Sequence, residues 1–135
     1  MTALPLGACV GVAYSHPDTQ TGVDGKEKLT NKIAKATKQK IKALFSIVLE
    51  NGHDAIVLSA FGCGAYRNPP EHMALLFQET IREEKYDEQM KYIVFAIIDD
   101  HNTGKAHNSE GNVKPFAVVF GGEENVLKLE TLLSK

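Results

Sequence analysis

Apolar and polar positions along this chain form blocks that predict strands separated by helices. The apolar stretch Leu6–Tyr14 ends at a polar turn, which predicts a first strand, and the polar, turn-rich stretch Thr19–Gly25 predicts a mobile surface loop. Ile56–Leu58 is too short for a buried helix and rich in β-branched residues, so it predicts a central strand covered on both faces. The apolar stretches Tyr92–Ile98 and Phe116–Phe120 predict two further buried strands.

Two long helices are predicted between these strands. The first contains the lysine-rich stretch from Lys26 to Lys42 and stops near Gly52. Its apolar positions recur at helical spacing and are Leu29, Ile33, Ala36, Ile41, Leu44 and Val48. The second begins with Asn68 as N-cap and Pro69 at its first position, and it runs to about residue 86. Its predicted core residues are Met73, Leu76, Phe77 and Ile81, and Leu127, Leu129 and Leu132 suggest a short closing helix.

The resulting order, β-α-β-α-β-β-α, predicts an α/β fold with a largely parallel sheet and helices on both faces. With 135 residues, of which 43% are hydrophobic, the chain is long enough for one domain over residues 1–135. A formal net charge of −2 argues against a general DNA or membrane surface. The lysine-rich helix is a local exception, and a solvated face is favoured there over contact with a polyanion.

A glycine-bracketed loop follows the strand Ile56–Leu58 and precedes the second helix. Gly62 and Gly64 allow a backbone concavity whose N–H groups suit phosphate oxygens, and the positive end of a helix dipole begins where the loop ends. The ring of Tyr66 can pack on a sugar, and the guanidinium of Arg67 can neutralise a phosphate. The competing interpretation is that the glycines only make a tight turn between strand and helix. The predicted ligand-binding residues are Phe61, Gly62, Cys63, Gly64, Ala65, Tyr66, Arg67 and Asn68.

This loop resembles the second phosphate loop of the microbial-type poly(ADP-ribose) glycohydrolases, a branch of the macrodomain fold. The resemblance rests on residues 58–69, with weaker likeness in Glu50–Asp54 and Val94–Ile97. It implies a three-layer α/β/α, macrodomain-like fold of which this chain has the C-terminal half, truncated on the N-terminal side. It also implies that the loop holds the diphosphate of ADP-ribose, with Tyr66 against the distal ribose. The implied partners are ADP-ribose, ADP-ribosylated proteins and poly(ADP-ribose).

The family's catalytic segments, a triple glycine followed by Gln-Glu-Glu, have no counterpart here. Gln78–Thr80 and Gly121–Glu124 match them neither in order nor in context. No catalytic residue is therefore predicted, and no metal or cofactor is predicted either. Binding of ADP-ribose or a related nucleotide diphosphate without cleavage is favoured. The alternatives are a fragment or divergent member of a glycohydrolase, and a structural remnant without a ligand. A sheet that lacks strands exposes an edge, so a homodimer or a partner chain that completes the sheet is expected.

Polar residues at the end of the strand from Tyr92 provide a candidate rim for the same cleft, because ligands of parallel sheets lie at the carboxyl ends of strands. The predicted rim residues are Asp99, His101 and Asn102. A metal-dependent hydrolase is one alternative, with ligands drawn from Asp99, Asp100, His101 and His107. A second alternative is that Cys63 is a nucleophile with a lowered pKa, with His72 or His101 as base. Because Cys9 and Cys63 lie far apart in sequence, a reducing compartment, cytoplasm or nucleus, is favoured.

Overall fold

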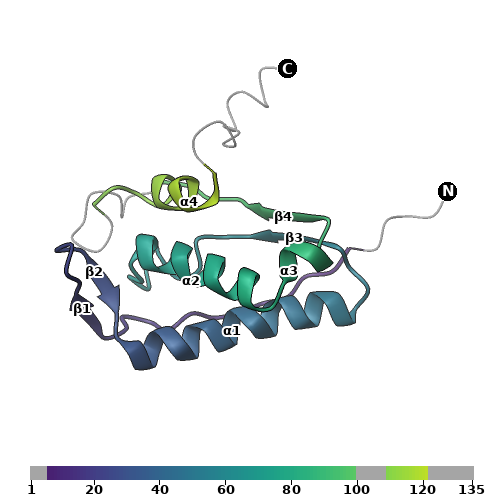
Figure 1. Ribbon diagram of the computed structural model, residues 1–135, viewed down its shortest axis with the longest axis horizontal. Coiled ribbons are helices and arrows are strands. Elements are labelled where there is room, and N and C mark those ends of the chain that lie inside the picture. Colours follow the sequence, from purple (N-terminus) through teal and green to yellow (C-terminus); the bar gives the residue numbers. More distant parts are fainter. Residues whose placement is uncertain (1–5, 100–108, 122–135) are drawn as a thin grey trace, which may run out of the picture.

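The computed structural model describes residues 6–99 and 109–121 and has an α/β architecture (Figure 1). In chain order the elements are β1 (Thr19–Thr21), β2 (Glu27–Leu29), α1 (Asn31–Glu50), β3 (Ala55–Leu58), α2 (Pro70–Glu83), α3 (Tyr86–Gln89), β4 (Tyr92–Phe95) and α4 (Val113–Phe120). β1 and β2 form an antiparallel hairpin, whereas β3 and β4 form a parallel pair in register from Ala55 opposite Tyr92 to Leu58 opposite Phe95. The closing helix predicted from Leu127, Leu129 and Leu132 lies outside the described residues.

One face of the β3–β4 pair is covered by helices and carries the core. Ile56 and Leu58 are buried on this face, and the ring of Phe95 meets rings from α2 and α4. Its centroid lies 5.2 Å from that of Phe77 and 5.1 Å from that of Phe116. Edge-to-face and tilted ring pairs of this kind add to the free energy gained from apolar burial. The predicted core residues of α2, Met73, Leu76, Phe77 and Ile81, are all buried.

The opposite face of the same pair is exposed in the part of the chain that the structure describes. Val57 is 69% exposed, Tyr92 59% and Val94 48%. The prediction that both faces of the strand Ile56–Leu58 are covered is therefore not met by the described residues. β4 is also shorter than the predicted strand Tyr92–Ile98, since the N–H of Ala96 makes the last bond to β3, at the carbonyl of Leu58.

The stretch predicted as a loop and helix start is instead the β1–β2 hairpin. Its three paired positions run from Thr19 opposite Leu29 to Thr21 opposite Glu27. α1 consequently begins only at Asn31, and Leu29 belongs to β2 rather than to the helix. Leu29 is fully buried, and its N–H donates to Nδ1 of His72 at 2.9 Å, which joins the hairpin to α2. This bond links residues far apart in sequence, so local patterning gives no sign of it.

α1 packs against α2 along the lower side of the view in Figure 1. Its buried residues are Thr37, Ile41 and Phe45, and the ring of Phe45 stacks on Tyr86 with centroids 4.4 Å apart. Of the predicted apolar set on this helix only Ile41 is fully buried, while Ile33, Leu44 and Val48 pack at the edge of the core.

The N-terminal segment, residues 6–14, is not the predicted first strand. Gly7 lies near the His53 ring and Ala13 lies against Gly62, so the segment runs in the same direction as β3. Among the described residues no backbone hydrogen bond joins it to β3, and its apolar side chains remain mostly exposed, with Leu6 at 96% and Val10 at 87%. An apolar stretch becomes a strand only where a partner completes its ladder.

The stretch Phe116–Phe120, predicted as a strand, is part of helix α4. The carboxylate of Asp99 accepts hydrogen bonds from the N–H groups of Asn112 (2.6 Å) and Val113 (3.1 Å), which satisfies the first amides of the helix. Pro115 lies in the first turn, where its missing N–H has no intrahelical acceptor to lose. A short apolar run fits a strand or a buried helix equally well. Here the hydrogen bonds from the first amides to Asp99 favour the helix.

α2 starts at Pro70 with Pro69 as N-cap, one residue later than predicted. It ends at Glu83 rather than near Tyr86, because Lys85 adopts a left-handed conformation, with a φ of 55°, before the short helix α3. Within the described residues, no helix combines the length and the apolar character needed to cross a membrane.

Candidate functional site: the loop between β3 and α2

Two successive turns form the loop that follows β3. In the first, the N–H of Cys63 donates to the carbonyl of Ala60 at 2.9 Å, and Gly62 at the third position has a φ of 72°, as a type II turn requires. In the second, the N–H of Arg67 donates to the carbonyl of Gly64 at 3.0 Å. The N–H of Asn68 then returns to the carbonyl of Gly62 at 2.9 Å, which closes the loop on itself.

The two glycines of the loop have different roles. A Cβ on Gly62 would overlap the Cβ of Ala13 and lie 2.6 Å from Nδ2 of Asn68, and its positive φ disfavours other residues. The turn and the packing alone therefore account for Gly62. Gly64 is not among the residues with positive φ. Its backbone conformation therefore does not require glycine.

The amides at the tip of the loop have no acceptor in the part of the chain that the structure describes. Among the described residues, the N–H groups of Gly64, Ala65 and Tyr66 donate no hydrogen bond. Consecutive N–H groups without an acceptor are the donors that an anion-binding concavity requires. α2 begins shortly afterwards at Pro70, so the positive end of its dipole lies next to the loop in sequence.

The loop side chains divide into exposed and buried groups. Ala65, Tyr66 and Arg67 are exposed, and Arg67 has a positive φ of 60°. Phe61, Cys63 and Asn68 are buried, so their side chains are part of the core rather than the surface. The ring and the guanidinium that the sequence suggested for ligand contact are thus the side chains that the fold leaves accessible.

The nucleophile alternative for Cys63 is wrong. The thiol is fully buried, and this burial, with the nearby Glu71 carboxylate as a smaller cause, raises the pKa of Cys63. A raised pKa keeps sulfur as the unreactive thiol rather than the thiolate. Its Sγ lies 3.7 Å from the carbonyl of Phe61.

His72 does not serve this thiol as a base in the structure, because its Nδ1 accepts the N–H of Leu29. Burial lowers the pKa of His72, with nearby Lys28 lowering it further and Glu79 opposing. The ring is therefore neutral near pH 7, with its proton on Nε2.

The N-terminal segment forms one side of the loop, which sequence reasoning missed. The carbonyl of Tyr14 accepts a hydrogen bond from Nδ2 of Asn68, and the N–H of His16 donates to the carbonyl of Tyr66 at 2.8 Å. His16 itself has a positive φ of 48°, in a region that histidine, asparagine and aspartate adopt more often than other residues with a side chain. No local pattern in the sequence marks this contact, because it joins residues about fifty positions apart.

The predicted rim is only partly described. Asp99 lies at the start of α4, where its carboxylate is engaged by two helix amides. His101 and Asn102 lie outside the described residues, as do Asp100 and His107 of the metal alternative. In the ranges 6–99 and 109–121, no three His, Cys, Asp or Glu side chains are grouped so as to hold a metal ion.

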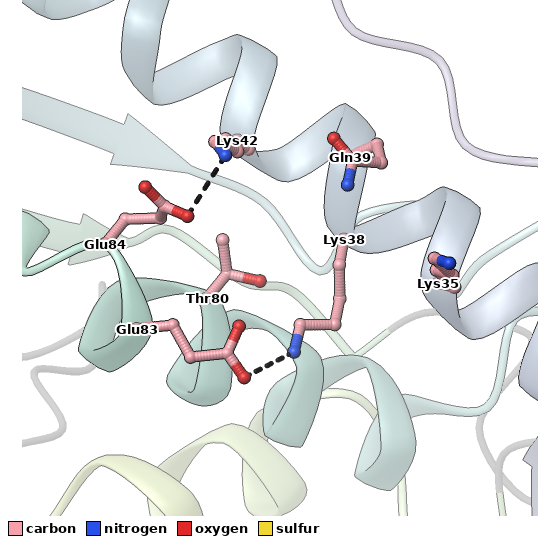
Figure 2. Close-up of a pocket in the computed structure, with 7 residues that line it drawn as sticks. All are labelled: Lys35, Lys38, Gln39, Lys42, Thr80, Glu83 and Glu84. Atoms are coloured by element: carbon pink, nitrogen blue, oxygen red, sulfur yellow. Dashed lines mark hydrogen bonds and ion pairs between the residues drawn. The ribbon is translucent and has the colours of Figure 1, made fainter.

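A pocket of about 220 Å³ lies elsewhere, between α1 and α2 (Figure 2). α1 lines it with Lys35, Lys38, Gln39 and Lys42, and the end of α2 lines it with Thr80, Glu83 and Glu84. Lys38 pairs with Glu83 at 2.8 Å, and Lys42 pairs with Glu84 at 3.1 Å. Within each pair the lysine and glutamate charges neutralise each other. This pocket therefore offers an anion much less positive charge than its lysines suggest. They also show that two lysines of the predicted solvated face contact α2.

No protein-family model and no curated protein matches the sequence. The chain has a macrodomain-like α/β fold, which it shares in part with solved structures of poly(ADP-ribose) glycohydrolase from Deinococcus radiodurans in complex with ADP-ribose. One of these is 20% identical with a TM-score of 0.55, over 65% of this chain and 33% of that chain. A mutant of the same enzyme is 21% identical with a TM-score of 0.55, over 67% and 34%. The chain thus spans about a third of the length of these structures.

Proposed function

We propose that this chain binds ADP-ribose through the loop Phe61–Asn68 and does not cleave it. The observation that carries the proposal is the run of three amides, at Gly64, Ala65 and Tyr66, that have no acceptor within residues 6–99 and 109–121. They occur in a loop that resembles the phosphate loop of poly(ADP-ribose) glycohydrolases, and the chain shares its fold with such enzymes in complex with ADP-ribose. Amides without a protein acceptor are suited to the oxygens of a diphosphate.

The exposed side chains complete the proposed contact. Tyr66, 41% exposed, offers a ring face to the distal ribose, and the Arg67 guanidinium offers a charge-assisted hydrogen bond to phosphate. Phe61 and Cys63 contribute their backbone, since their side chains are buried. Asp99, His101 and Asn102 remain the proposed rim of the cleft, with the Asp99 carboxylate held by α4.

The proposal extends to ADP-ribosylated proteins and poly(ADP-ribose), because both carry the same diphosphate. Such ligands occur inside cells, which agrees with a cytoplasmic or nuclear location and with the free thiols of Cys9 and Cys63. Absence of the triple-glycine and Gln-Glu-Glu segments supports binding without turnover. If hydrolysis of poly(ADP-ribose) by the purified chain were measured, the glycohydrolase alternative would replace this one.

The test is calorimetric titration with ADP-ribose, with AMP and ribose 5-phosphate as controls. We expect micromolar affinity that requires the diphosphate. Gly64→Val should abolish binding while the protein stays folded, because a branched side chain blocks the approach of phosphate and no positive φ is needed there. Ala55→Val, an exposed substitution in β3, is the matched control and should bind normally. Undiminished affinity of Gly64→Val would show that the loop is only a turn.

A second candidate function is assembly with another copy of this chain. The exposed residues Val57, Tyr92 and Val94 form an apolar row on one face of the β3–β4 pair. Burying such a row against a second copy removes apolar surface from water and completes the layer. Light scattering at micromolar concentration should give a dimer mass, and Val57→Lys should restore the monomer mass. A monomeric native protein would remove this candidate.

A further inference from the structure

Asn68 lies behind the loop rather than at its surface. The residue is fully buried, and its Nδ2 donates to the carbonyl of Gly62 at 3.0 Å and to the carbonyl of Tyr14 at 2.8 Å. One amide group therefore connects the first turn of the loop to the N-terminal segment. Because both partners are backbone carbonyls, the position needs a side chain with two N–H groups and not merely one of the right size.

The orientation of this side chain is fixed by its partners. If the amide were reversed, its oxygen would face two carbonyl oxygens, which repel it. In the observed orientation Oδ1 is buried and accepts no hydrogen bond from the described residues. A buried oxygen without a hydrogen bond is destabilising. The favourable contribution of this side chain therefore comes from the two hydrogen bonds that its Nδ2 donates.

Two further contacts support the loop from the same segment. Ala13 lies against Gly62, and the N–H of His16 holds the carbonyl of Tyr66. The carbonyls of Gly62 and Tyr66 are thus both engaged by protein groups, whereas the amides of residues 64–66 donate to no acceptor among the described residues. This arrangement holds the loop in one conformation before any ligand arrives, which reduces the ordering cost of binding.

We infer that Asn68 is a positioning residue that fixes the loop to the N-terminal segment and keeps its amides arranged for a diphosphate, rather than a residue that contacts the ligand. The inference rests on the proposed function for the identity of the ligand, but the bracing itself is a property of the protein alone. The structure corrects the prediction that Asn68 is the N-cap of α2, since Pro69 takes that place. The inference gives Asn68 a different role from the direct ligand contact that the sequence predicted.

The wild-type protein tests the bracing without any substitution. In nuclear magnetic resonance spectra, the side-chain amide of Asn68 should exchange with solvent far more slowly than that of Asn51, which is exposed and donates to the carbonyl of Ile47. With added ADP-ribose, the backbone amides of residues 64–66 should shift, while the side-chain amide of Asn68 stays slow to exchange. Exchange as fast as that of Asn51 would overturn the inference, whether or not ADP-ribose binds.

Asn68→Asp tests the consequence for binding. The new side chain has the same size, but its carboxylate cannot donate to the two carbonyls. We expect roughly tenfold weaker ADP-ribose binding and faster backbone amide exchange over residues 62–68. Ile81→Ala, a core substitution in the last turn of α2, should lower the melting temperature without changing affinity or loop exchange.

The outcomes separate the two proposals. If wild-type protein binds no ADP-ribose, the proposed function fails, and loop exchange in Asn68→Asp still decides the role of Asn68. If wild-type protein binds and Asn68→Asp binds equally well with unchanged loop exchange, the inference is wrong and the proposed function stands. Should Asn68→Asp fail to fold, the exchange rate of the wild-type side-chain amide gives the answer.

Discussion

The two faces of the β3–β4 pair carry similar residues in very different surroundings. On one face, Ile56 and Leu58 are buried, and the ring of Phe95 contacts rings from α2 and α4. On the other, Val57 and Tyr92 are more than half exposed. Successive side chains of β3 point to opposite faces of the sheet, so neighbouring residues are alternately buried and exposed. This holds although every residue from Ile56 to Leu58 is apolar.

Apolar sequence alone therefore does not define a core. The covered face is part of the core because α2 and α4 supply rings, with Phe77 and Phe116 meeting Phe95. The exposed face has the same composition but no described element over it. Stability should depend on the first face, whereas the second face is available for assembly.

The sharpest test of the comparison substitutes neighbouring residues of β3 in the same way. Ile56→Thr should lower the free energy of unfolding by about 2–4 kcal/mol, because it removes buried apolar atoms and places a hydroxyl in the core. Val57→Thr keeps the β-branched shape on the exposed face and should change it by less than about 0.5 kcal/mol.

Urea denaturation followed by circular dichroism measures both values. The experiment is repeated at several protein concentrations, because a second copy over the exposed face makes stability depend on concentration. Equal losses for the two variants would mean that Val57 is buried in solution and that the two faces do not differ in their contribution to stability.

Much of the covered side was predictable because its signals are local. Helical spacing identified the core of α2, as the burial of Met73 and Phe77 confirms, and β-branched residues identified β3. The loop between them was recognisable from its glycines and its likeness to a phosphate loop. In these segments, propensity, periodicity and tertiary packing all agree.

The predictions that failed depended on contacts between distant residues. Phe116–Phe120 is helical because Asp99 caps the start of α4, and Asn68 is not an N-cap because its side chain is used by the carbonyls of Tyr14 and Gly62. The hairpin strands have only three residues each and are mostly polar, so they give no strong alternation. In each case tertiary structure overrode an ambiguous local signal.

A smaller effect is expected where the hairpin joins the covered side, through the bond from the N–H of Leu29 to His72. The pKa of His72 is lowered from its ordinary value of 6.5, so the unfolded chain takes up the proton more readily than the folded protein does. The contribution of His72 to the free energy of unfolding is fully present above pH 6.5. It is lost as the pH falls from 6.5 through the lower pKa of the folded state. Protonation of Nδ1 also removes the acceptor for Leu29.

Denaturation midpoints at pH 7.5 and pH 5 measure this dependence. His72→Asn supplies a side-chain oxygen near the position of Nδ1 but does not titrate, so it should reduce the loss of stability between the two pH values. The bond itself contributes about 1 kcal/mol. An unchanged pH dependence in His72→Asn would assign the effect to other groups and would leave the hairpin's attachment independent of pH.

The smallest effect is expected at the outer surface of the covered side, where Lys38 bridges Glu79 and Glu83. These carboxylates raise the pKa of Lys38 above 10.5, so the favourable charge interaction is present at neutral pH and is lost only as the pH rises through the folded pKa. The carboxylates are more than half exposed, and solvent screens the pairs.

Lys38→Met, which keeps the aliphatic stem, should therefore lower the free energy of unfolding by less than about 1 kcal/mol, and the difference from wild type should shrink in 1 M salt. A loss as large as that of Ile56→Thr would mean that ion pairs, and not the burial of apolar residues such as Ile41 and Phe45, hold α1 in place.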